Sequence, residues 1–457
     1  MTQKHDSLFL PEMKNPPFIL CVNPWIHDFA AYDFWAKPLG LLYLAGLLRA
    51  SGCRVGYIDC LDRFHPKDKH RPGEPFFRCG RGPYRKTHIA KPAGLRDVPR
   101  RYSRYGIDPE WFVSDLKAAG RPDLVLVTCV MAYWYPGAVE TAGIIKSVYP
   151  DVPVVLGGIY ATLYPHHASG LTNIDEVAAG PGGERVFDMV EKYTGLRPAP
   201  PCDPGSMDAV PYPAMDLQNE IPYAPMLTAK GCPFSCGYCA SSILQPELKR
   251  RDPRTVFEEI LFWHDSYGIK DFAFYDDALL LDARNHADVV FSMIRDSGMD
   301  IRLHTPNALH VRNISRKTAV LMREAGVKTV RLGLETAEFE YREIDGKVCA
   351  QEFEQAAAYL REAGFSSNEL GAYLLAGLPG QDPASVEFSI DRVKDAGIKP
   401  VIAYYSPIYG TKMWDAAKAA SRYDLEADPV FTNNSVMPCQ RSFSWELASR
   451  FKKRISS

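Results

Sequence analysis

The sequence predicts an α/β protein with two domains, an N-terminal doubly wound parallel sheet and a C-terminal partial (β/α)6 barrel. Short apolar runs alternate with amphipathic helical patterns in both halves of the chain, which is typical of parallel sheets covered by helices. A proline-rich stretch without periodicity, residues 197–224, separates the two series and is expected to be a linker. The 457 residues suffice for two or three domains of ordinary size.

The composition excludes several classes of protein. The chain has 53 Lys and Arg against 55 Asp and Glu, and this balance argues against a protein whose whole surface binds nucleic acid or membrane. No run of about 18 apolar residues is present and the N-terminus does not resemble a signal peptide, so we expect a cytoplasmic protein without membrane association. Eleven cysteines, an odd number, do not indicate a disulfide framework in such a chain.

The first 196 residues contain five candidate strands with helical patterns between them. Ligands of an open parallel sheet bind beyond the carboxyl ends of its strands, which here are the loops after Val22, Thr128 and Leu156. The strand candidates are Phe18–Val22, Val55–Ile58, Leu124–Thr128, Val152–Leu156 and Asp175–Ala178.

A basic insertion, residues 61–118, interrupts this series. Its residues 61–105 include 13 Lys or Arg against 4 Asp or Glu, a local charge of +9. The insertion is either a solvated surface segment or an arm that holds an anionic ligand or partner. The sequence does not separate a nucleic acid from a small phosphorylated molecule.

A second series of strands and helices occupies residues 225–415, and residues 416–457 are expected to form a short C-terminal tail. Six strands are two fewer than a complete parallel barrel has, and the chemistry of such barrels gathers at the carboxyl ends of the strands. The strand candidates are Pro225–Ala229, Asp271–Tyr275, Asp300–His304, Thr329–Leu334, Gly371–Ala376 and Pro400–Tyr405.

Three cysteines, Cys232, Cys236 and Cys239, lie within eight residues after the first of these strands. Thiolates at spacings of four and three residues suit a metal site. A structural zinc site needs four ligands, and no fourth Cys or pair of His lies near them in the sequence. A [4Fe–4S] cluster accepts Cys ligands, and three of them leave one iron free for an outside ligand.

The pattern C-x3-C-x2-C, with an aromatic residue before the last Cys, resembles the radical S-adenosylmethionine (SAM) superfamily over residues 225–415. The resemblance implies that the three cysteines hold a [4Fe–4S] cluster, which cleaves SAM to methionine and a 5′-deoxyadenosyl radical. The pair Asp276-Asp277 stands where the family usually has Gly-Gly-Glu. His304 could also reach SAM or substrate. Matching positions imply SAM contacts at Tyr238, Asp276, Asp277, Asn307, Glu335, Gly377, Leu378 and Pro379.

The N-terminal half resembles the cobalamin (B12)-binding branch of that superfamily. The resemblance rests on the segments 37–45, 155–158 and 180–184. No Asp-x-His-x-x-Gly motif is present, so no His is marked as the lower cobalt ligand. Cys129, Met131 and Tyr133 would face the corrin or are packing residues. The implied cobalamin contacts are Thr128, Gly157, Gly158, Gly182, Gly183 and Glu184.

The resemblance implies a cobalamin-dependent enzyme that methylates an unactivated carbon of a small-molecule or peptide substrate. It also implies an electron donor such as flavodoxin or ferredoxin, and it names no catalytic residue beyond the cofactor contacts. Three alternatives stay open: a radical cyclisation, oxidation or rearrangement without methyl transfer, an RNA-modifying enzyme, and a non-catalytic iron–sulfur redox protein. Nucleic acid is the less favoured partner, because no nucleic-acid-binding module follows the barrel.

Overall fold

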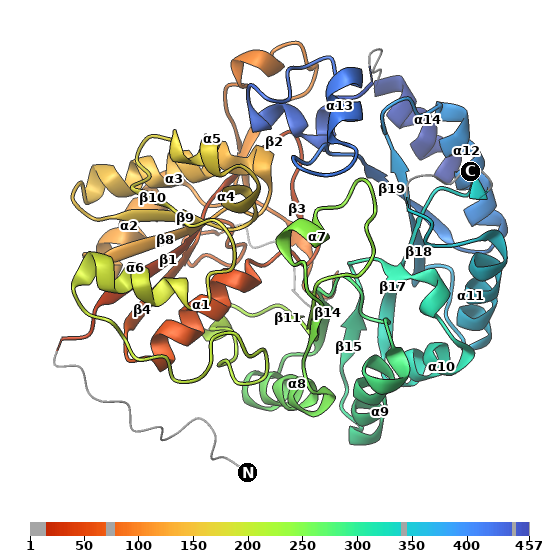
Figure 1. The fold of residues 1–457 in the computed structure, drawn as a ribbon, viewed down its shortest axis with the longest axis horizontal. Coiled ribbons are helices and arrows are strands. Elements are labelled where there is room, and N and C mark those ends of the chain that lie inside the picture. Colours follow the sequence, from red (N-terminus) through yellow and green to blue (C-terminus); the bar gives the residue numbers. More distant parts are fainter. Residues whose placement is uncertain (1–14, 70–77, 340–344, 441–444, 457) are drawn as a thin grey trace. The chain divides into compact units, whose positions relative to one another are not determined.

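The computed structural model describes residues 15–69, 78–339, 345–440 and 445–456. The chain divides into two compact units, Met1–Ile221 and Pro222–Ser457 (Figure 1). Over the described ranges, no helix has the length and apolar character that a membrane span requires.

The first unit is built on a parallel sheet of five strands in the order β10-β9-β8-β1-β4. Numbered along the chain, this order is 2-1-3-4-5, a doubly wound arrangement in which ligands bind where the strand order reverses, between the first and third strands. Those strands are β1 and β8 here. The strands are β1 (Phe18–Asn23), β4 (Arg54–Asp59), β8 (Leu124–Thr128), β9 (Val154–Gly157) and β10 (Glu176–Val177).

Helices cover both faces of this sheet because successive strand residues point to opposite sides. Leu20 and Val22 of β1 pack with α2 (Pro109–Ala119) and α3 (Tyr135–Val148). Ile19 and Cys21 of the same strand pack on the other face with α1 (Leu39–Ala50) and α6 (Arg185–Thr194). Two short helices, α4 (Ile159–Leu163) and α5 (Pro165–Ser169), follow β9.

The predicted insertion, residues 61–118, ends too late. Phe112 and Leu116 of α2 are completely buried in the core, so α2 is a covering helix of the sheet and the added segment ends before it. This segment contributes to two small antiparallel sheets, one ordered β2-β7-β6 and one pairing β3 with β5. Their strands are β2 (Ile26–Asp28), β3 (Tyr32–Asp33), β5 (Gly82–Pro83), β6 (Lys86–His88) and β7 (Ser103–Tyr105).

The proline-rich stretch 197–224 is not a free linker over its whole length. Ala214 is completely buried against the α1 side of the sheet, and its backbone N–H donates to the Leu42 carbonyl at 2.9 Å. A Cβ on Gly46 of α1 would lie 2.5 Å from the Tyr212 carbonyl oxygen, so the absence of a side chain lets the segment lie against the helix. The expected linker thus belongs to the first unit up to Ile221.

The second unit contains the predicted six parallel barrel strands, in the order β11-β14-β15-β17-β18-β19. A further short strand, β16 (Leu309–His310), pairs with β17. The barrel strands are β11 (Ala224–Met226), β14 (Asp271–Phe274), β15 (Arg302–His304), β17 (Val327–Glu335), β18 (Leu370–Ala376) and β19 (Lys399–Tyr404). The helices that connect them are α8 (Pro253–Tyr267), α9 (Ala287–Ser297), α10 (Arg316–Glu324), α11 (Ala350–Glu362) and α12 (Pro383–Asp395).

The expected C-terminal tail is an integral part of this unit. Ala417 of α13 (Trp414–Ala420), Leu425 and Cys439 share an apolar cluster with Leu378, which follows β18. The last helix, α14 (Trp445–Ser456), is joined to α12 by an ion pair in which Arg454 Nε donates to Asp391 Oδ1 at 2.9 Å. The tail is therefore packed because its apolar residues cover the barrel strands.

Candidate functional site

The three clustered cysteines lie on a loop that a short hairpin closes. The hairpin strands are β12 (Ala229–Lys230) and β13 (Lys249–Arg250), and the loop includes the short helix α7 (Ser241–Leu244). Gly231 enters the loop with φ +87°, and a Cβ there would lie 2.4 Å from the Glu247 carbonyl oxygen. Only glycine fits this backbone position, so Gly231 shapes the start of the loop.

The segment after β19 is distant in sequence from the cysteine loop but forms hydrogen bonds with it. Lys412 Nζ donates to Ser235 Oγ at 3.0 Å, and the Met413 backbone N–H donates to the Gly237 carbonyl at 3.0 Å. Sequence reasoning missed Lys412 because no local pattern links it to residues so distant along the chain.

The thiols themselves suit a metal cluster. All three are free of disulfides, and Cys236 is buried whereas Cys232 and Cys239 are half-buried. His310 Nε2 lies 3.7 Å from Cys232 Sγ, and Ser241 Oγ lies 3.2 Å from Cys239 Sγ. Burial raises the pKa of the Cys232 and Cys236 thiols, and nearby Lys347 partly offsets this rise at Cys236. Three sulfur donors on one partly sheltered loop fit the ligand set of a [4Fe–4S] cluster.

Glu335 ends β17 in a strained conformation. Its φ is +65°, in the left-handed region that side chains other than glycine rarely adopt, and the β17–β18 register shifts between Gly333 and Glu335. Such a conformation costs about 1–3 kcal/mol and persists where the surroundings impose it, often at functional sites. The strain places a buried carboxylate at the carboxyl end of the barrel.

Lys347 joins Glu335 to the cysteine loop. Its Nζ lies 3.5 Å from Glu335 Oε1 and donates to the Tyr238 hydroxyl at 2.8 Å, while that hydroxyl donates to Asp345 at 3.2 Å. Burial would lower the pKa of Lys347, but the negative charges of Glu335, Cys236 and Asp345 raise it above its ordinary value. Burial also raises the pKa of Tyr238. Sequence reasoning did not find Lys347, because no local pattern connects it to Glu335 or to Tyr238.

The turn after β18 lies in the same apolar cluster as Tyr238, which packs against Leu378 and its neighbours. Gly377 has φ +92°, and the backbone N–H groups of Gly377 and Leu378 both donate to Gln381 Oε1, at 2.8 and 3.2 Å. Pro379 follows, half-buried. Gln381 was not predicted, and it holds the shape of the turn.

The two aspartates after β14 lie in different surroundings. Asp276 is buried and accepts hydrogen bonds from Thr228 N (3.1 Å), Thr228 Oγ1 (2.5 Å) and Ala229 N (2.6 Å). Burial raises its pKa to about 6 against these bonds. The Asp276 side chain therefore holds the segment that joins β11 to β12, and its predicted contact with SAM stays a prediction. Asp277 is half-buried, and burial raises its pKa as well.

His304 is the last residue of β15, but its ring is buried within the sheet. It is completely buried, with Nε2 3.0 Å from Asp271 Oδ1 and Nδ1 3.1 Å from Thr329 Oγ1 on neighbouring strands. The expectation that it reaches SAM or substrate is wrong, since both ring nitrogens are engaged within the sheet. Asn307 is exposed, and its Nδ2 donates to the Tyr275 carbonyl at 2.6 Å, beyond the end of β14.

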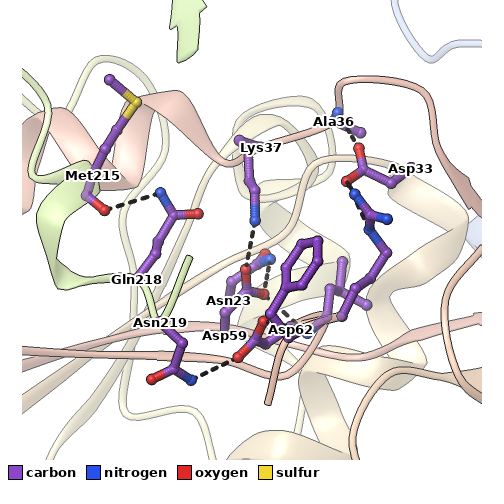
Figure 2. Close-up of polar contacts among 12 residues, drawn as sticks. Asn23, Asp33, Ala36, Lys37, Asp59, Asp62, Met215, Gln218 and Asn219 are labelled. Carbon is purple, nitrogen blue, oxygen red and sulfur yellow. Dashed lines mark hydrogen bonds and ion pairs between the residues drawn. The ribbon is translucent and has the colours of Figure 1, made fainter. Parts of the chain in front are cut away.

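A polar network joins the carboxyl ends of β1 and β4 in the first unit (Figure 2). Asp59 Oδ1 accepts from Asn23 Nδ2 at 2.7 Å, and Asp59 Oδ2 lies 3.3 Å from Lys37 Nζ. The side chains of Lys37 and Asp59 are only 11% and 6% exposed. Lys37 belongs to a segment that carried the cobalamin resemblance, and here it forms a buried ion pair.

The predicted cobalamin positions fall at the carboxyl ends of β8, β9 and β10. Gly158 has φ +92°, and a Cβ on it would lie 2.6 Å from Thr128 Oγ1, so packing between strands already requires this glycine. A Cβ on Gly182 would meet Leu44 at 2.9 Å, whereas Gly157 and Gly183 have only ordinary contacts. Glu184 is exposed next to the start of α6.

This edge fits a flat, largely apolar ligand. Val130 and Ile159, which follow neighbouring strands, are each 37% exposed beside the glycines. Exposed apolar side chains next to side-chain-free backbone offer a surface for a macrocycle and its tail. Cys129 and Tyr133 are not part of that surface, because both are buried in the core.

His27, in the segment after β1, is engaged in a polar contact within the first unit. It is buried, and its Nε2 lies 2.7 Å from Glu140 Oε2. Burial would raise the pKa of Glu140, but hydrogen bonds and charge from His27 and Arg104 lower it. The loop after β1 is thus closed by its own polar contacts.

Comparisons with known proteins agree with this geometry. Residues 226–404 match the family described as the Radical SAM superfamily. An uncharacterized methyltransferase, PH0819, of Pyrococcus horikoshii is 28% identical over 327 residues, 65% of this chain and 70% of its own length. The cytidylyl-2-hydroxyethylphosphonate methyltransferase of Streptomyces wedmorensis is 22% identical over 88% of this chain and 82% of its own length. The anaerobic magnesium-protoporphyrin IX monomethyl ester cyclase of Rubrivivax gelatinosus is 25% identical over 60% of this chain and 54% of its own length.

The fold is also that of a solved structure. The radical SAM methyltransferase TsrM from Kitasatospora setae superposes with a TM-score of 0.63 at 17% identity, over 89% of this chain and 77% of TsrM. The likeness extends across both units and therefore shows the combination of an α/β unit with a partial barrel. The likeness to TsrM shows the fold, and the family match over residues 226–404 shows that this part of the chain is a radical SAM domain.

Proposed function

We propose that the chain is a cobalamin-dependent radical SAM methyltransferase that acts on an unactivated carbon of a small molecule or peptide. The observation that carries the radical SAM part is the group of Glu335, Lys347 and Tyr238 beside the loop with the three cysteines. The methyl-transfer part is supported by the names of PH0819, the phosphonate methyltransferase and TsrM. One solved structure of TsrM holds cobalamin together with a [4Fe–4S] cluster.

Each group of the site has a distinct task in this proposal. When bound, the cluster supplies the electron that cleaves SAM, and cobalamin carries the methyl group. Cys232, Cys236 and Cys239 hold the cluster, and Lys347 offers a cation for the carboxylate of SAM. Glu335 accepts hydrogen bonds from the ribose hydroxyls. These charges lie in a partly buried site, where they act more strongly than in water.

Other residues would line the two cofactors. On the SAM side, the apolar cluster around Leu378 and Tyr238 shelters the adenine, and Asp277 and Asn307 remain candidate polar contacts. On the first unit, the edge at Gly157 and Gly183 would receive cobalamin. An electron donor of the flavodoxin or ferredoxin kind would reduce the cluster.

The test is a measurement of cofactors and products on protein purified anaerobically from cells supplied with cobalamin. We expect about four irons and one corrin per chain, and reductant-dependent conversion of SAM to 5′-deoxyadenosine. Labelled methyl groups from SAM should move to the bound corrin. Iron without corrin, despite the supply, would contradict methyl transfer while leaving the radical SAM assignment intact.

A radical reaction without methyl transfer is the second candidate, and the cyclase relative favours it. Counting SAM molecules consumed per product separates the two. Methyl transfer requires two SAM per product and yields S-adenosylhomocysteine besides 5′-deoxyadenosine. A cyclisation yields 5′-deoxyadenosine alone.

A further inference from the structure

The basic insertion of the first unit carries a cleft that the radical chemistry does not use. The cleft lies in the β6–β7 hairpin and has a volume of about 460 Å³. We call it the insertion cleft. Its lining residues are His88, Ile89, Lys91, Pro99, Arg100, Arg101 and Tyr102.

The loop that forms the insertion cleft is a built structure. The Ile89 backbone N–H donates to the Tyr102 carbonyl at 3.1 Å, and the Tyr102 hydroxyl donates to the His27 carbonyl at 3.0 Å. Leu95 and Val98, at the centre of the loop, are almost completely buried. The cleft is therefore held by a small apolar core and does not depend on a ligand for its shape.

Some basic residues of the insertion are paired with carboxylates, and others are not. Basic residues behind the cleft are neutralised, as the pairs Arg85–Asp108 and Arg104–Glu140 show, at 2.8 and 2.7 Å. The Lys91 Nζ donates instead to the Val98 carbonyl.

The outermost cation of the cleft has no anionic partner either. Arg101 Nη1 lies 3.2 Å from His88 Nε2, which is not a negative charge. Among the residues that the structure describes, neither Lys91 nor Arg101 forms an ion pair with a carboxylate, and no carboxylate lines the cleft. Lys91 and Arg101 thus present positive charge that no described carboxylate pairs with.

We propose that the insertion cleft binds the phosphate or phosphonate group of a small molecule. A guanidinium binds such oxyanions in a bidentate way, and an ammonium adds a point charge. The cleft is an open surface depression, which suits recognition of one exposed charged group.

A single-stranded RNA is less suited to the same surface. RNA binding needs aromatic faces on which bases stack, along a positively charged groove that tracks the backbone. The Tyr102 ring is buried and its hydroxyl is engaged within the unit, so of the two aromatic rings that line the cleft only His88 is exposed, and successive bases would need more than one such face. All lining residues of the cleft come from one loop, so the cleft can hold one anionic group but does not form an extended groove.

The experiment is a calorimetric titration of the full-length protein with inorganic pyrophosphate at about 50 mM salt, where charge interactions are weakly screened. We expect one site per chain. Arg101→Gln changes an exposed side chain and should weaken binding about tenfold, and the double variant Lys91→Gln/Arg101→Gln should weaken it further.

The matched control removes the same charge elsewhere on the first unit. Lys117→Gln/Arg121→Gln alters two exposed residues at the end of α2 and should leave the affinity unchanged. Equal weakening by both double variants, or no binding by the wild type, overturns the proposal. So does a single-stranded RNA of 12 nucleotides that binds at the cleft and that pyrophosphate does not displace.

Discussion

Lys347 Nζ lies 3.5 Å from Glu335 Oε1, between the end of β17 and the cysteine loop. The carboxylate belongs to a residue with φ +65°, and the ammonium also contacts the Tyr238 hydroxyl. A strained backbone costs free energy, and so does the desolvation of a buried ion pair. Both persist only where other interactions of the folded protein offset these costs. Their coincidence at the carboxyl end of a barrel strand identifies the position where SAM is expected.

Glu335→Gln should weaken SAM binding about tenfold or more, because a hydrogen bond to a charged group contributes about 1.5–3 kcal/mol. Equilibrium dialysis with labelled SAM on iron-loaded protein measures the effect, and iron content should not change. Glu354→Gln, on the exposed side of α11, is the control. Unchanged SAM affinity in Glu335→Gln would remove Glu335 from the site.

Replacing Cys232, Cys236 and Cys239 together by Ala should reduce bound iron from about four to less than one per chain. The protein should still fold, since these residues lie on a loop outside the strands. Iron and sulfide analysis, with circular dichroism, measures both. Cys349→Ser changes an exposed cysteine of the same unit and should retain the iron. Retention of iron in the triple variant would assign the metal to other ligands.

Asp276→Asn should change how stability depends on pH. Burial raises the pKa of Asp276 from 3.8 to about 6, so its contribution to stability is present below pH 3.8 and is lost as the pH rises through about 6. The asparagine has no such loss, so relative to the wild type the variant should gain up to about 3 kcal/mol between these pH values.

Hydrogen exchange of the β11 and β14 amides, compared between the two proteins at each pH, measures this difference. Glu258→Gln, at an exposed position of α8, should show no such change. A difference that is constant with pH would mean that folding does not raise the pKa of Asp276.

The two neighbouring glycines after β9 should respond differently to alanine. Gly158→Ala should destabilise the first unit by about 1–3 kcal/mol, because its Cβ would lie 2.6 Å from Thr128 Oγ1 at a φ of +92°. Gly157→Ala meets nothing closer than 3.8 Å and should melt like the wild type but retain less than half of the corrin. Thermal melting and corrin absorbance measure these outcomes. Full corrin retention in Gly157→Ala would show that the corrin does not bind at this edge.

Much of the site could be predicted from the sequence, because the patterns that indicate it involve residues close together in the chain. The spacing of Cys232, Cys236 and Cys239 lies within one loop, and Glu335 ends a strand whose apolar pattern is continuous. The strands and helices of both units followed from periodicity for the same reason. The prediction for His304 failed because a histidine suits both a cofactor site and a buried polar contact, and here both ring nitrogens are bonded within the barrel.

The sequence alone determined the two α/β series, the cysteine motif and the radical SAM domain, because each depends on residues close together in the chain. The tertiary structure decided which polar residues remain available. It brought Lys347 to Glu335 and Lys412 to the cysteine loop, and it packed the tail and most of the proline-rich stretch onto the units. These outcomes depend on contacts between residues far apart in sequence, whose free energy arises only when the strands have assembled.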